Sequence, residues 1–116
     1  MVSEALRQVM LAAAGAGRLT GADLVVAAAE HPVCGDLLEF DCRLDDGVVL
    51  ECAWRAEGCP ATMAVAAALP QALVGHPIGE AGARLRRLIA DLGGLAATES
   101  HALAMALRAL AGVAKR

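Results

Sequence analysis

The stretch LLEFDCRLDDGVVLECAWR, residues 37–55, decides the fold. Its first half alternates apolar and polar residues, a period of two that is typical of a half-buried strand. The apolar positions there are Leu38, Phe40, Cys42 and Leu44. Asp45-Asp46-Gly47 then has the composition of a tight hairpin turn. We therefore predict two antiparallel strands, over residues 37–44 and 48–55.

The returning strand is expected to bury every second residue as well. The expected inward positions are Val48, Leu50, Cys52 and Trp54. Before the hairpin, residues 24–29 (LVVAAA) are too short for periodicity to distinguish a strand from a helical turn.

Four other segments have the apolar spacing of amphipathic helices. They are residues 3–14, 60–74, 79–92 and 99–114. Ser3 is a suitable N-cap for the first, and Pro60 is favourable at the start of the second, where its missing N–H costs nothing. Pro70 predicts a kink or an early stop in that second helix. A short antiparallel sheet followed by helices indicates one α+β domain, residues 1–116.

Composition narrows the classes of function. Of the 116 residues 58% are hydrophobic, but Phe40 and Trp54 are the only aromatic ones, so the core must use small aliphatic side chains. Ten basic and 13 acidic residues give a net charge of −3 without a basic stripe, which argues against nucleic-acid binding. Apolar runs are too short to span a membrane. We expect a cytoplasmic protein.

Disulfides are rare in the cytosol, so each of the four cysteines is expected to be either a buried core residue or a reactive or metal-binding thiol. Cys42 and Cys52 lie on the apolar faces of the two strands, where cysteine is a small buried hydrophobe. Cys34 and Cys59 lie outside the strands, on either side of the hairpin. The hairpin can bring these two to the same end of the sheet.

Cys34 and Asp36 flank a glycine that permits a sharp turn. A thiolate and a carboxylate two residues apart could together bind a metal. The alternative is a simple turn with a buried cysteine and a capping aspartate.

Cys59 comes just before the helix that begins at Pro60. The free N–H groups and dipole of a helix start favour a thiolate there, although a small N-cap residue is the alternative. His101, near the start of the last helix, offers an imidazole, a common metal ligand. His31 is either a solvated loop residue or a neighbour of a site at Cys34, and His76 reads as a surface residue.

Pro32-Val33-Cys34-Gly35-Asp36, a hairpin, Gly58-Cys59 before a helix, and a late histidine together resemble the iron–sulfur cluster scaffold family of the IscU and NifU N-terminal type. The resemblance covers roughly residues 3–114. It implies a three-stranded antiparallel sheet covered by helices, and therefore a strand at 24–29.

Members of that family accept sulfur from a cysteine desulfurase, assemble a [2Fe–2S] cluster and pass it to apo-protein recipients; they can also bind zinc. The resemblance implies that Cys34 and Cys59 are ligands, that Asp36 tunes the lability of the cluster, and that His101 completes the set. It implies a carrier rather than an enzyme.

Two features depart from the family pattern. Ala102 stands where the family has a third ligand cysteine. The chaperone motif Leu-Pro-Pro-Val-Lys is replaced by Leu-Ala-Ala-Thr-Glu at residues 95–99, which argues against docking of an Hsp70-type chaperone. Two hypotheses follow: a divergent scaffold that binds a [2Fe–2S] cluster or iron transiently, or a zinc-binding homologue that docks to or regulates a cysteine desulfurase.

Overall fold

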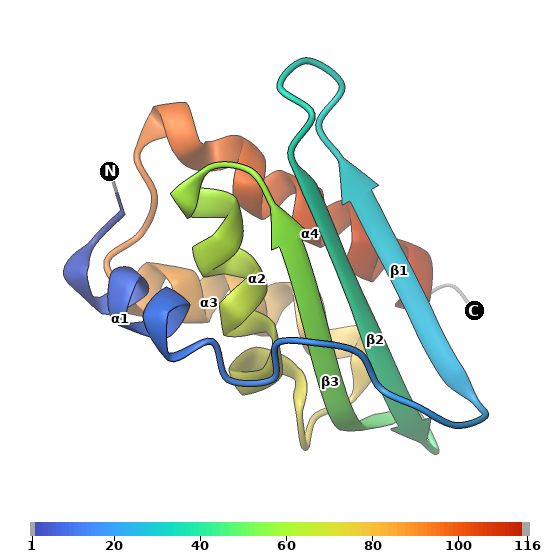
Figure 1. Ribbon diagram of the computed structural model, residues 1–116. Helices are drawn as coiled ribbons and strands as arrows, with labels where there is room; N and C mark the ends of the chain where they lie inside the picture. Colours follow the sequence, from blue (N-terminus) through green and yellow to red (C-terminus); the bar gives the residue numbers. More distant parts are fainter. Residues whose placement is uncertain (1, 115–116) are drawn as a thin grey trace.

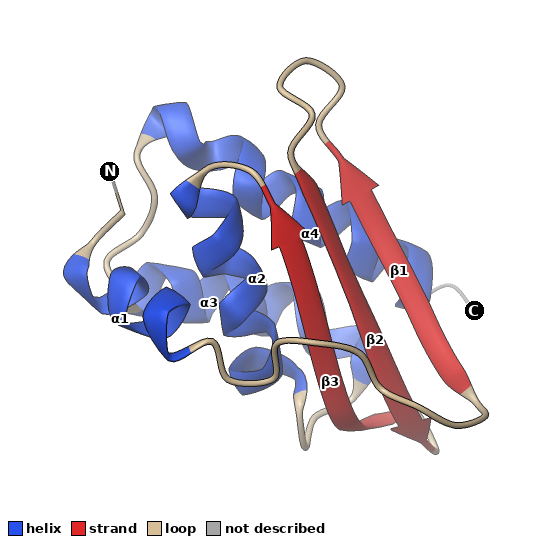
Figure 2. Cartoon of the chain, in the orientation of Figure 1, coloured by secondary structure: helices blue, strands red, loops and turns tan. Residues whose placement is uncertain are grey.

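The computed structural model describes residues 2–114 and has an α+β fold (Figures 1 and 2). Its three strands, in the spatial order β1-β2-β3, form one antiparallel sheet. The strands are β1 (Leu24–Glu30), β2 (Leu37–Asp45) and β3 (Val48–Glu57). The helices are α1 (Glu4–Ala12), α2 (Pro60–Leu73), α3 (Ala81–Asp91) and α4 (Ser100–Ala114), with short 3-10 turns at Ile78–Glu80 and Ala97–Glu99. The predicted fold class is confirmed.

The element ends follow local chemistry. Asp46 and Gly47 both have positive φ, 50° and 79°, as a two-residue hairpin turn requires. The hydroxyl of Ser3 accepts the Leu6 N–H and caps α1. Pro60 opens α2, and the helix continues past Pro70 to Leu73, so Pro70 does not stop it early.

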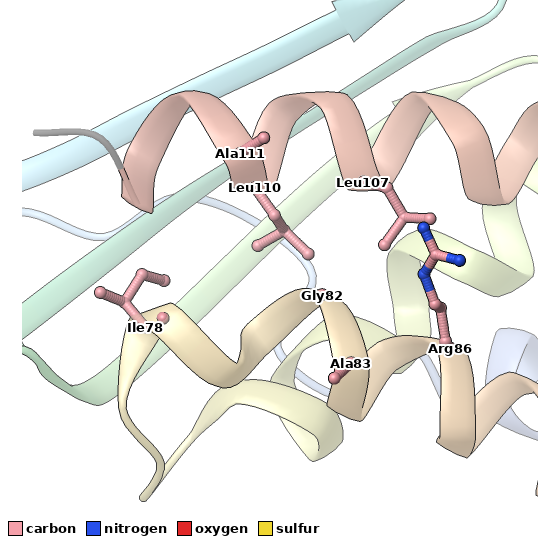
Figure 3. Close-up of a pocket in the computed structure, with 8 residues that line it drawn as sticks. Ile78, Gly82, Ala83, Arg86, Leu107, Leu110 and Ala111 are labelled. Carbon is pink, nitrogen blue, oxygen red and sulfur yellow. The ribbon is translucent and has the colours of Figure 1, made fainter.

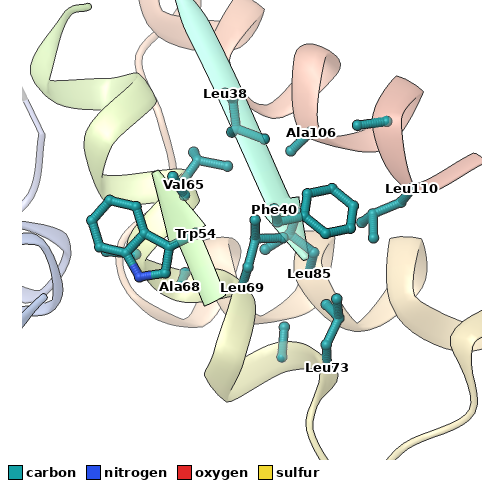
Figure 4. Packing of buried hydrophobic residues seen from close by; sticks show 14 of the residues in the cluster. Leu38, Phe40, Trp54, Val65, Ala68, Leu69, Leu73, Leu85, Ala106 and Leu110 are labelled. Atoms are coloured by element: carbon teal, nitrogen blue, oxygen red, sulfur yellow. The ribbon is translucent and has the colours of Figure 1, made fainter. Parts of the chain in front are cut away.

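One face of the sheet carries the core. α2 packs over β3 and α4 over β1, while α1 and α3 pack against α2. α2 is buried on nearly all sides, which its many alanines permit by allowing close helix packing. Figure 4 shows Phe40, Leu69, Leu85 and Leu110 meeting between the sheet and the helices.

The predicted inward face of β3 is wrong at its start. Val49 is fully buried, whereas Leu50 is 49% exposed. The pairing register shifts here: Arg43 lies opposite Glu51, but Leu44 lies opposite Val49. Leu50 is therefore the extra residue of a β-bulge, which reverses the alternation on that side of it.

The second face of the sheet is crossed by the segment between α1 and β1, which Figure 1 shows passing over the strands. Arg43 donates hydrogen bonds to the carbonyls of Thr20 and Ala22, and Asp41 accepts the Leu19 N–H. Asp41 is consequently buried although its position in the alternation is outward. Within residues 2–114, no helix is long and apolar enough to cross a membrane.

Candidate metal centre

Three segments that are distant in the chain meet at one end of the sheet, the upper end in Figure 1. They are the β1–β2 connection at residues 31–36, the start of α2 and the start of α4. β1 and β3 both run toward this end because each is antiparallel to β2. The topology thereby brings the loop of Cys34 and the N-cap residue Cys59 together.

Asp36 joins two of these segments. Its carboxylate Oδ2 accepts a 2.8 Å hydrogen bond from the Thr62 hydroxyl and a 3.3 Å bond from the Cys59 N–H. The carboxyl also lies directly against Gly58, whose φ is 139°, and a Cβ there would collide with it. Gly58 thus provides both the backbone angle and the space for Asp36.

The carboxyl of Asp36 is buried but remains a good candidate for a charged ligand. Burial alone would raise its pKa, but hydrogen bonds from Cys59, Thr62 and Cys34 hold the pKa well below its ordinary value. The start of α2 adds a favourable partial positive charge. The site therefore keeps a fixed negative charge under neutral conditions.

All four residues predicted from the sequence lie together. A thiol, a carboxylate oxygen and a ring nitrogen, from Cys34, Asp36 and His101, all lie within 4.8 Å of one another. Nε2 of His101 is 3.5 Å from Asp36 Oδ2 and 3.5 Å from Cys59 Sγ. Their role as metal ligands stays a prediction.

Two separations within the group suit a single ion. Metal–ligand bonds of about 2.0–2.3 Å in a tetrahedral zinc site separate neighbouring ligand atoms by about 3.3–3.8 Å. The two 3.5 Å separations at His101 already lie in that range. Cys34 is exposed on its loop. The donor set of two sulfurs, one oxygen and one nitrogen fits zinc or iron.

Three residues of the site were missed or left open by the sequence. The Thr62 hydroxyl donates to Asp36 and lies 3.5 Å from Cys59 Sγ. Its place in the first helical turn after Cys59 is the sequence feature that could have indicated this role. Gly58 makes room for Asp36. His31 packs against His101, with ring centroids 5.2 Å apart, so it belongs beside the site rather than in solvent.

The other cysteines and Ala102 belong to the core. Cys42 and Cys52 face each other in the β2–β3 register and are buried, as predicted. Ala102 is fully buried. Ala102 follows His101 directly on α4, about 100° further round the helix.

One surface hollow lies beside this centre and another lies away from it. One of about 560 Å³ lies beside it, lined by Val2, Glu4, Arg7, Met10, Pro60 and Glu99. A second, of about 330 Å³, lies between α3 and the far half of α4, where Leu107 and Leu110 face Gly82 (Figure 3). No predicted site residue lines the second hollow.

The sequence matches a known protein family. The model of the NifU-like N terminal domain matches residues 7–115. The chain belongs to this family. The Cys34–Asp36 turn, Cys59 and His101 all lie inside the matched part of this NifU-like domain.

Known proteins agree on the fold. The N-terminal NifU-like protein of Brucella abortus superposes with a TM-score of 0.72 at 16% identity, covering 97% of this chain and 90% of that one. A protein of Fervidobacterium islandicum AW-1, named for scaffold function in the SUF system, gives 0.73 at 14% identity, covering 93% and 92%.

The zinc-dependent sulfurtransferase SufU of Bacillus subtilis (strain 168) is 31% identical over 70 residues, which is 60% of this NifU-like domain. The match spans about half, 47%, of that relative's length.

Proposed function

We propose that this chain is a scaffold- or carrier-like protein of iron–sulfur cluster assembly, which holds a [2Fe–2S] cluster or iron transiently as its cargo. The convergence of Cys34, Asp36, Cys59 and His101 at one end of a NifU-like fold carries the proposal. The name of the Fervidobacterium protein, which describes an iron–sulfur cluster assembly scaffold of the SUF system, supports it.

The residues suit transient binding. The thiolates of Cys34 and Cys59 supply the strong bonds, while the Asp36 carboxylate and His101 imidazole are weaker partners for iron than a thiolate. Cys34 is exposed, so a cysteine desulfurase that donates sulfur and an apo-protein that receives the cargo can both reach it. The chain would act as a carrier, without enzymatic turnover of its own.

Anaerobic reconstitution with iron and sulfide tests this proposal. The wild-type chain should develop visible charge-transfer absorption, and Cys34→Ala should lose it. Cys42→Ala is the matched control, because it also removes one thiol but from the buried core. Absence of the absorption in the wild type, or its full retention in Cys34→Ala, would contradict the scaffold function.

A second candidate is a zinc-binding homologue that docks to or regulates a cysteine desulfurase. It is favoured by the two 3.5 Å separations at His101, which fit the ligand spacing of one tetrahedral ion. The name of the Bacillus relative, a zinc-dependent sulfurtransferase, also supports it.

Metal analysis of protein purified without oxygen separates the candidates. Near-stoichiometric zinc, with a melting temperature that falls after chelation, favours the zinc-binding function. The variant Ala102→Cys restores a thiol on α4 next to His101. If only this variant assembles a stable cluster, the natural chain is not a competent scaffold.

A further inference from the structure

His31 holds the loop that carries Cys34. Its ring Nδ1 accepts the Val33 N–H at 3.3 Å and the Cys34 N–H at 3.2 Å. Its backbone closes the same turn, because the His31 carbonyl accepts the Gly35 N–H at 2.9 Å and the His31 N–H donates to the Asp36 carbonyl at 2.8 Å. Four hydrogen bonds of this six-residue loop therefore end on one residue.

Pro32 explains why the His31 ring accepts hydrogen bonds from the second and third residues after it. Proline has no N–H, so the first donors after His31 are those of Val33 and Cys34. Val33 is 87% exposed and Cys34 is exposed, so apolar packing does little to hold the loop tip. The loop tip is held instead by hydrogen bonds to His31, two of them at Nδ1.

The same ring contacts the other side of the site. The imidazoles of His31 and His101 pack edge to face, with centroids 5.2 Å apart and planes at 71°. This contact joins the β1–β2 loop to the first turn of α4, 70 positions later in the chain. His31 thus contacts two candidate ligand residues. It accepts a hydrogen bond from the backbone of Cys34 and packs its ring against His101.

His31 is placed to position ligands rather than to be one. A neutral ring that accepts two N–H groups at Nδ1 carries its proton on Nε2. The Nδ1 lone pair of His31 is already used by the Val33 and Cys34 N–H groups, so it is not directed at a metal. We propose that His31 is a positioning residue of the metal centre, which sets the mutual placement of the Cys34 thiol and the His101 imidazole.

Three substitutions separate the two contacts. His31→Asn keeps a side-chain acceptor that can bond the N–H two residues on, as in an Asx turn, but loses the ring. His31→Phe keeps a ring beside His101 but loses the acceptor. His31→Ala loses both. His76→Ala is the matched control, because His76 lies in the turn after α2, away from the site.

The first measurement is Co²⁺ affinity, read from thiolate-to-cobalt charge transfer. We expect His31→Ala to bind Co²⁺ about 10- to 100-fold more weakly, the usual cost of losing a group that orients a metal ligand. His31→Asn and His31→Phe should each recover part of this loss. His76→Ala should match the wild type. Wild-type Co²⁺ affinity in His31→Ala would overturn the proposal.

The second measurement needs no metal. Amide hydrogen exchange at Val33 and Cys34 in the metal-free chain should accelerate in His31→Ala and His31→Phe but not in His31→Asn. Only the Co²⁺ affinity measurement rests on the proposed function. If the wild type binds no Co²⁺, the proposed function fails while exchange still tests the loop. Unchanged exchange in all variants would overturn the positioning role.

Discussion

The hydroxyl of Thr62 donates a 2.8 Å hydrogen bond to Oδ2 of Asp36. This bond joins the first turn of α2 to the residue that precedes β2, and both side chains are buried. A buried carboxylate depends on its donors, because it has exchanged water for them. The geometry of the candidate site is therefore coupled to the packing of α2.

Thr62→Val removes this donor while keeping the shape of the side chain. We expect a loss of about 1.5–3 kcal/mol in the free energy of unfolding, typical of a hydrogen bond to a charged group. Thr62→Ser keeps a hydroxyl and should lose less. Urea unfolding of the metal-free chain measures both, and equal losses in the two variants would contradict the role of the hydroxyl.

Gly58→Ala places a Cβ against the Asp36 carboxyl at a φ of 139°, which side-chain-bearing residues rarely adopt. We expect a loss of about 1–3 kcal/mol from backbone strain alone, together with weaker metal binding. Gly112→Ala is the matched control, since it lies in α4 with open space around it. It should stabilise by about 0.5–1 kcal/mol. Thermal unfolding distinguishes the two, and a neutral Gly58→Ala would refute the close packing.

Asp41 predicts a pH dependence of stability. Burial would raise its pKa, but hydrogen bonds from Arg55 and from the Leu19 N–H hold the pKa below its ordinary value. The unfolded chain therefore takes up the proton first as the pH falls below about 3.9. Stability from this group is present above that pH and is lost as the pH falls through the folded-state value.

Asp41→Asn should lower the free energy of unfolding at pH 7 and flatten its decline toward acid pH. Denaturant unfolding of both proteins over a series of pH values measures this. Since other carboxyls titrate in both proteins, only the difference between the two curves reports on Asp41. Parallel curves would show that the ion pair with Arg55 contributes nothing to the pH dependence.

The four cysteines should react with iodoacetamide in the order of their exposure. Cys34 is exposed, Cys59 is partly buried, and Cys42 and Cys52 are buried. Peptide mapping of the metal-free chain should find Cys34 modified first, Cys59 more slowly, and the core pair only after unfolding. Bound Zn²⁺ should protect Cys34 and Cys59 together. Protection of one without the other would separate them from a common site.

Local residue patterns sufficed for much of this protein. Alternation and Asp45-Asp46-Gly47 predicted the hairpin, and the Cys59-Pro60 pair predicted the start of α2, because turns and helix caps depend on a few neighbouring residues. The burial of Cys42 and Cys52 followed from the same alternation. The strand at Leu24–Glu30 was ambiguous by pattern and came from the family resemblance.

Long-range contacts determined the rest. The bulge at Leu50 arises in the pairing of β3 with β2, so no periodicity within β3 alone could show it. The burial of Asp41 depends on a segment that crosses the sheet from elsewhere in the chain. The hydrogen bond from Thr62 to Asp36 and the packing of His31 on His101 join residues 26 and 70 positions apart. Residue types could indicate the candidate metal ligands, but only the folded chain could place the residues that hold them, because such support comes from neighbours in space.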